Sequence, residues 1–176
     1  MWWFYTVILG MAFGQVLQEL AVAMRDWRNQ TRRPFATAML WQIFLLALTV
    51  QVWLALTYYR DTVTEISILE LAAFLAVPAG ILLMSFLLPD SDFGRMRPLF
   101  FGILIGMVAI NLLHTLAIGE LGFDLDLLFQ CLIIAGGIIG LMLRSTRADI
   151  WLGVAMIAIV LTYIGVGYST VEVGSP

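Results

Sequence analysis

Lysine is absent from this sequence, and charged residues of any kind are rare. Aspartate, glutamate and arginine together make up only 12% of the 176 residues, whereas 62% are hydrophobic. A soluble domain usually contains about one quarter charged residues. Because so few charges cannot cover the outward faces of a water-soluble domain of this length, the composition indicates an integral membrane protein.

Cysteine and histidine are nearly missing too, with one of each, Cys131 and His114. A single cysteine excludes an intrachain disulfide, and these two residues alone do not complete a structural zinc site. One histidine also excludes a haem held between two histidines of this chain. We therefore expect no metal or other cofactor. A haem with mixed ligands, or a haem or pigment shared with a partner chain, stays open.

Signals for catalysis or nucleic-acid binding are missing as well. The sequence has no nucleotide-binding loop and no catalytic motif, and no basic groove or aromatic platform lies outside the apolar segments. An enzyme acting on lipid would need Asp, Glu, His or Ser residues that converge at one depth, and no such set is evident. We expect a protein that is not an enzyme and binds no nucleic acid, with a lipid-acting membrane enzyme as the alternative.

Six apolar stretches are long enough, or nearly so, to cross a bilayer as helices, which takes about 20 residues each. Their connections are short, so consecutive helices should be antiparallel neighbours, and no stretch is left for a soluble domain. The sequence thus predicts an all-α fold, a single transmembrane domain over residues 1–176 with its shortest span fifth. The stretches are Trp2–Met24, Ala38–Tyr59, Ile66–Leu88, Pro98–Ile118, Leu127–Leu143 and Ile150–Tyr168.

Arginine is distributed unevenly among the predicted loops. Only Arg60 follows the second helix, whereas all the others follow the first, third and fifth helices: Arg25, Arg28, Arg32, Arg33, Arg95, Arg97, Arg144 and Arg147. By the positive-inside rule those three loops lie in the cytoplasm. Both termini are then expected on the non-cytoplasmic side of a plasma membrane, specifically a bacterial inner membrane.

Glycines four residues apart occur in three of the predicted helices. This spacing opens a flat strip on one helix face, against which a neighbouring backbone can pack closely in lipid. Two interpretations are open: packing inside the bundle, or an interface with a second copy or another membrane subunit. The pairs are Gly10 and Gly14, Gly102 and Gly106, and Gly136 and Gly140.

Pro78 and Gly80 lie in the middle of the third predicted helix. Proline removes a backbone hydrogen bond and kinks a helix, and inside a membrane neighbouring groups must satisfy the freed carbonyl. The kink is either purely architectural or a hinge that opens a site. The sequence alone does not separate these two interpretations.

Polar side chains within the predicted spans gather on the first and fourth helices. Residues three or four apart share a helix face, so each group forms a patch, and polar groups in a span usually face protein or a water-filled cavity. We interpret the patches either as hydrogen bonds between helices or as a pathway for a solute or ion. Glu70 of the third helix lies either at the mouth of this pathway or within reach of the lipid headgroups. The patches are Gln15, Gln18 and Glu19, and Asn111, His114 and Thr115.

The first and fourth helices also resemble each other in sequence. FYTVILGMAFGQVLQELAV aligns without a gap with FFGILIGMVAINLLHTLAI, so that Gly10-Met11 falls on Gly106-Met107. Repeats three helices apart run in opposite directions, as in many transporters with inverted symmetry. Two apolar helices also match easily by chance, and the second and fifth helices do not continue the register.

Two functions of different classes fit these features. The first is transport, in which the bundle passes a small solute or ion along the polar faces of the first and fourth helices while the third flexes at Pro78. The second is a non-catalytic accessory or scaffold role in a larger membrane complex, which the glycine strips and the lack of a soluble domain favour. The expected partners are the lipid bilayer and either further copies of the chain or other membrane subunits.

Overall fold

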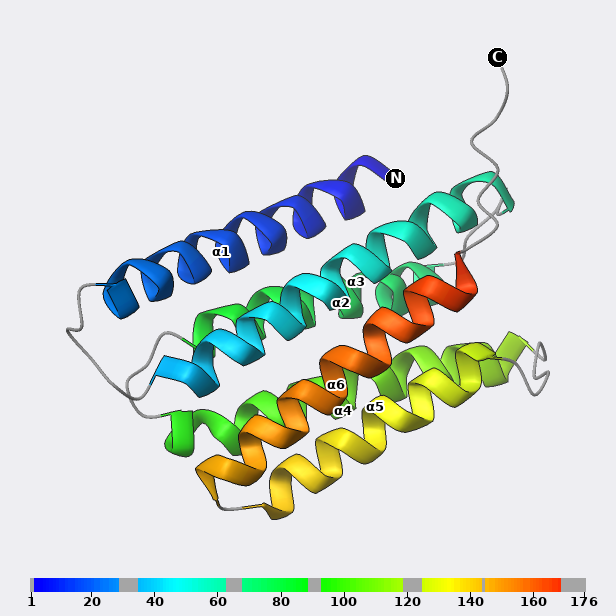
Figure 1. The fold of residues 1–176 in the computed structure, drawn as a ribbon. Coiled ribbons are helices and arrows are strands. Elements are labelled where there is room, and N and C mark those ends of the chain that lie inside the picture. The colour runs from blue at the N-terminus through cyan, green and yellow to red at the C-terminus, as the bar shows by residue number, and fades with distance from the viewer. Residues whose placement is uncertain are drawn as a thin grey trace.

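A computed structural model describes residues 2–28, 35–62, 68–88, 93–118, 125–143 and 145–168 of the chain. Within these ranges the chain forms six α-helices and no strand, and the helices run side by side as a bundle (Figure 1). The predicted all-α class is therefore confirmed for the described residues. The helices are α1 (Trp2–Arg28), α2 (Phe35–Thr62), α3 (Ile68–Leu87), α4 (Phe93–Ile118), α5 (Leu125–Met142) and α6 (Thr146–Gly167).

Several helices extend further than the apolar stretches predicted. α2 begins at Phe35 rather than Ala38, and α4 begins at Phe93 rather than Pro98. A helix can continue past its apolar part because its internal hydrogen bonds satisfy the backbone wherever the segment lies. The prediction that Pro98 opens its helix is wrong, because Pro98 lies in the second turn of α4.

Five helices in the described part of the chain are long and apolar enough to cross a membrane. We expected the fifth span to be the shortest, but α5 is long enough to cross as Leu125–Met142. The helix that falls short is α3, whose apolar part is Leu71–Leu87. This composition supports an apolar helical bundle embedded in a membrane. The sixth span stays a prediction.

The helices form a ring of neighbours in the order α1, α3, α4, α5, α6 and α2 (Figure 1). α3 packs along both α1 and α4, and α6 packs along both α2 and α5. α2 closes the ring against α1 and also touches α3 across the bundle. α1 and α4, which carry the predicted polar patches, are therefore both neighbours of α3.

An aromatic cluster fills the bundle near the ends where α2 and α4 begin. Trp41 of α2 is fully buried and meets Phe44, Phe100 and Phe101 edge to face, with ring centroids 5.1–5.5 Å apart. Phe93 stacks on Trp41 from the first turn of α4. Such ring pairs contribute about 0.5–1.5 kcal/mol each beyond the area that they bury. This cluster joins α2 to α4 in the interior.

The packing gives no support to an inverted repeat. Such a repeat would reproduce the long contact between α1 and α3 as one between α4 and α6, yet those two helices do not pack along each other in the described residues. The aligned methionines also differ, since Met11 is 58% exposed and Met107 only 4%. The likeness of α1 and α4 in sequence therefore has no counterpart in their packing.

Candidate functional site

The glycine pair of α1 lies on the outward face of the bundle. Gly10 and Gly14 are exposed, and a Cβ atom added to either would meet no atom within 4 Å. The opposite face of α1, which carries Ala12 and Val16, is fully buried against the bundle. The helix therefore turns both glycines away from its own chain.

Gln18 continues this outward face by one more turn, and we call Gly10, Gly14 and Gln18 the α1 strip. The Gln18 side chain is exposed, while Gln15 and Glu19 beside it are half-buried and joined by a hydrogen bond of 2.9 Å from Gln15 Nε2 to Glu19 Oε1.

These polar groups lie deep in the candidate span Trp3–Arg25. Gln15 and Glu19 precede Arg25 by ten and six residues, which is roughly 15 and 9 Å along a helix. Amide and carboxyl groups at that depth are costly to leave against lipid. The α1 strip thus places glycine and glutamine on the outward face of an apolar span.

The glycine pair of α4 is also unpacked. A Cβ atom added to Gly102 or Gly106 would meet no atom within 4 Å. Leu99 and Leu113, both exposed, extend the same outward side of the helix. Two of the three predicted glycine strips therefore face away from the chain.

The polar patch of α4 turns toward α3. The His114 ring meets Phe74 of α3 edge to face at 5.9 Å, and Phe74 in turn lies 6.3 Å from Tyr5 of α1. His114 Nε2 is buried and accepts or donates no hydrogen bond among the described residues. Asn111, one turn earlier, is half-buried. His114 lies four residues before the end of α4, whereas Gln18 lies past the middle of α1, which runs in the opposite direction. The structure therefore does not bring the two patches together.

Two residues of the predicted pathway cannot be placed. Glu70 lies in α3 and Thr115 in α4, but their side chains lie outside the described part of the structure. Their suggested roles stay predictions from sequence.

Pro78 and Gly80 bring α3 close to α4. Both are buried, and a Cβ atom added to Gly80 would lie 2.9 Å from Met107 Sδ. Glycine at this position thus permits the close approach of the two helices. The contact supports the architectural interpretation, and the hinge stays a prediction.

The glycine pair of α5 has the opposite environment from those of α1 and α4. Gly136 and Gly140 are buried, and an added Cβ atom would collide with Met156 of α6 at the first and with Phe101 of α4 at the second. These glycines pack within the chain, where they allow α4 and α6 to approach α5.

A buried ion pair joins α4 to α6 at the arginine-rich end of the bundle. Arg97 Nη2 donates a hydrogen bond of 2.5 Å to Asp149 Oδ1, and the two side chains are only 9% and 10% exposed. The guanidinium carbon lies 5.7 Å from the centre of the Phe101 ring. The Ser145 side chain caps α6 by accepting a hydrogen bond from Ala148 N. In the sequence, Arg97 served only as a marker of orientation, and its pairing with Asp149 was not predicted.

A second polar cluster joins α5 to α6 at the other end. Tyr163 Oη donates to Asp126 Oδ1 at 2.9 Å, and Gln130 Nε2 donates to Asp126 Oδ2 at 3.0 Å. The Tyr163 ring stacks on Phe129 with centroids 4.2 Å apart and meets Tyr168 edge to face. The predicted fifth span began at Leu127, one residue after Asp126, although a carboxylate at the start of an apolar stretch is typical of a first helical turn.

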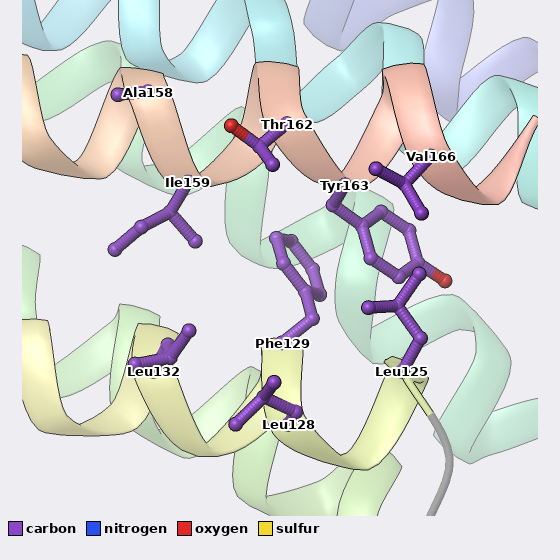
Figure 2. A pocket seen from close by; sticks show the side chains of 9 residues that line it. All are labelled: Leu125, Leu128, Phe129, Leu132, Ala158, Ile159, Thr162, Tyr163 and Val166. Atoms are coloured by element: carbon purple, nitrogen blue, oxygen red, sulfur yellow. The ribbon is translucent and has the colours of Figure 1, made fainter.

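An apolar groove of about 260 Å³ lies between α5 and α6 beside this cluster (Figure 2). Leu128 and Leu132 of α5 line one side, and Ile159 and Val166 of α6 line the other. Tyr163, which donates to Asp126, is part of the lining. No sequence motif marks this groove.

No family model, curated protein or solved structure matches this chain. The function is therefore argued from the arrangement of its own residues. Among those that the structure describes, no three or more His, Cys, Asp or Glu residues are grouped so that they could hold a metal ion. Cys131 is exposed on α5, whereas His114 packs on α3.

Proposed function

We propose that this protein is a non-catalytic accessory subunit of a larger membrane complex, and that a transmembrane helix of another subunit covers the α1 strip. The observation that carries the proposal is the outward position of Gly10, Gly14 and Gln18 within an apolar span. Glycines let a second backbone approach closely, and polar side chains offer it hydrogen bonds. Lipid chains offer no hydrogen bond to Gln18 or Glu19.

Transport along α1 and α4 has less support from the geometry. It would need the polar patches of both helices to face one path, whereas each helix packs along α3. The interior between α2 and α4 is occupied by Trp41, Phe100 and Phe101, which are all fully buried. An accessory role accounts for the outward strip without requiring a path through this core.

The orientation in the membrane is part of the proposal. Arg25 and Arg28 end α1, Arg95 is in the first turn of α4, and Arg147 is in the first turn of α6. These helix ends lie on the same side of the bundle (Figure 1). By the positive-inside rule this side faces the cytoplasm of the cell, with the bundle in the plasma membrane.

Replacing Gly14 by leucine should release the partner without unfolding the chain. The isolated chain leaves open space around the new side chain, but leucine would hold a second backbone away from α1. We expect Gly14→Leu to reduce partner recovery about tenfold, which corresponds to about 1.4 kcal/mol. The measurement is quantitative pull-down from membranes in a mild detergent, with helicity of the purified chain checked by circular dichroism.

Gly165→Leu is the matched control, because Gly165 of α6 is equally outward, with nothing within 4 Å of an added Cβ atom. This variant should keep the partner. Equal partner recovery with Gly14→Leu and Gly165→Leu would exclude the α1 strip as the interface. If the recovered complex contains only further copies of this chain, the accessory role is wrong and the α1 strip is a self-assembly interface.

A further inference from the structure

The three polar residues of the α1 patch have different surroundings. Gln15 Nε2 donates to Glu19 Oε1 at 2.9 Å, so these two half-buried side chains pair with each other within the chain. Gln18 is exposed on the outward side that carries Gly10 and Gly14, and no other described residue forms a hydrogen bond with its amide. Gln18 is therefore the polar group of this patch that faces outward with its hydrogen-bonding capacity unused.

Helix geometry directs the Gln18 side chain toward Gly14. The Cα–Cβ bonds of an α-helix tilt toward its N-terminus, so a side chain covers the turn that precedes its own Cα atom. For Gln18 this direction leads away from Arg25, which lies seven residues later, roughly 10 Å along the helix. Lysine and arginine reach the membrane interface on long stems, which glutamine lacks. The Gln18 amide thus lies within the candidate span Trp3–Arg25, beside the glycines.

A second side-chain amide is the group that best complements Gln18 at this depth. Gln18 has two N–H donors and one carbonyl acceptor, and an amide without hydrogen bonds is costly in an apolar medium. Another amide can exchange two hydrogen bonds with it, whereas a hydroxyl group has a single donor. A charged side chain is costlier still within a span, and it would find no opposite charge on Gln18. The nearby carboxyl group of Glu19 is already bonded to Gln15.

We infer that the helix covering the α1 strip carries an asparagine or glutamine whose side-chain amide exchanges two hydrogen bonds with Gln18. Glycine spacing brings the two backbones closest at Gly10 and Gly14, so a partner residue one turn further along lies within reach of Gln18. The pair selects one register of the partner helix, because an apolar residue in its place leaves the Gln18 amide unbonded. This inference rests on the proposed accessory role and specifies the chemistry of the partner.

The test replaces Gln18 by methionine, which keeps an unbranched side chain but removes the amide. Partner recovery from membranes in a mild detergent should fall about fivefold, as expected when helices lose a hydrogen bond inside a membrane. Gln15→Met is the matched comparison, because the Gln15 amide is bonded within its own chain, and this variant should keep the partner. Circular dichroism of both purified variants confirms that their helices are intact. Equal partner recovery with the two variants would overturn the inference.

Cross-linking distinguishes a failure of this inference from a failure of the accessory role. A photoactivatable label on Leu17→Cys marks the partner segment beside Gln18, and mass spectrometry of the linked peptide should show asparagine or glutamine within one turn. Replacing that residue by leucine should cost nothing more in a Gln18→Met chain. A linked partner segment without such an amide would refute the amide pair and leave the accessory role standing. Cross-links to lipid alone would refute both.

Discussion

Replacing Asp149 by leucine should lower the free energy of unfolding by about 3–5 kcal/mol, because it leaves a buried guanidinium without its counterion. Arg97 is 9% exposed and packs on Phe101, so water cannot easily replace the lost carboxylate. α4 and α6 do not pack along each other in the described residues, which leaves the ion pair as a direct link between them. The measurement is a denaturant titration in mixed micelles, followed by circular dichroism.

The double variant Arg97→Met with Asp149→Leu distinguishes the cost of an unpaired buried charge from the net contribution of the ion pair to stability. Replacing both partners of a buried ion pair by apolar residues is often neutral or stabilising. We therefore expect the double variant to recover most of the stability that Asp149→Leu loses. Exposed ion pairs typically contribute less than about 1 kcal/mol to the free energy of unfolding. A decrease of that size for Asp149→Leu alone would contradict a buried pair.

Replacing Gly140 by leucine should lower the free energy of unfolding by about 3 kcal/mol or more, as overpacking of a filled core does at its upper range. A Cβ atom at Gly140 already collides with the Phe101 ring. That ring cannot move aside, because Phe101 is fully buried among Trp41 and Phe100. α4 and α5 would have to separate, and the same denaturant titration measures the result.

Gly102→Leu provides the control for Gly140→Leu. Gly102 belongs to the same kind of glycine pair but has no atom within 4 Å of an added Cβ atom, so its replacement should change stability by only about 0.5 kcal/mol. If both variants are equally stable, the assignment of α5 glycines to the interior and α4 glycines to the outside is wrong.

The sequence predicted the membrane bundle well because helix formation in lipid depends mainly on local composition and length. Helix ends were less predictable, since a helix can continue past its apolar part. Phe35 and Phe93 begin their helices in stretches that the apolar pattern assigned to loops. Hydropathy shows which residues can lie against lipid. It does not show where the backbone hydrogen bonds of the helix end, and these continue beyond the apolar residues.

The glycine pairs show what the sequence could not predict. The three pairs have the same spacing, yet Gly140 meets Phe101 whereas Gly14 meets nothing. The difference depends on which helices become neighbours, and local spacing carries no information on that. The polar clusters were missed for the same reason, because Arg97 and Asp149 are 52 positions apart and Asp126 and Tyr163 are 37 apart.

The central claim, that another membrane subunit covers the α1 strip, is tested most directly by a photo-crosslinking scan in native membranes. Single cysteines replace Met11 and Leu17, the exposed residues that flank the strip, in a Cys131→Ser chain and carry a benzophenone label. Met142, 76% exposed on α5, is the comparison position. We predict cross-links to a second polypeptide from positions 11 and 17 and none from position 142. Cross-links to lipid alone from all three positions would contradict the account.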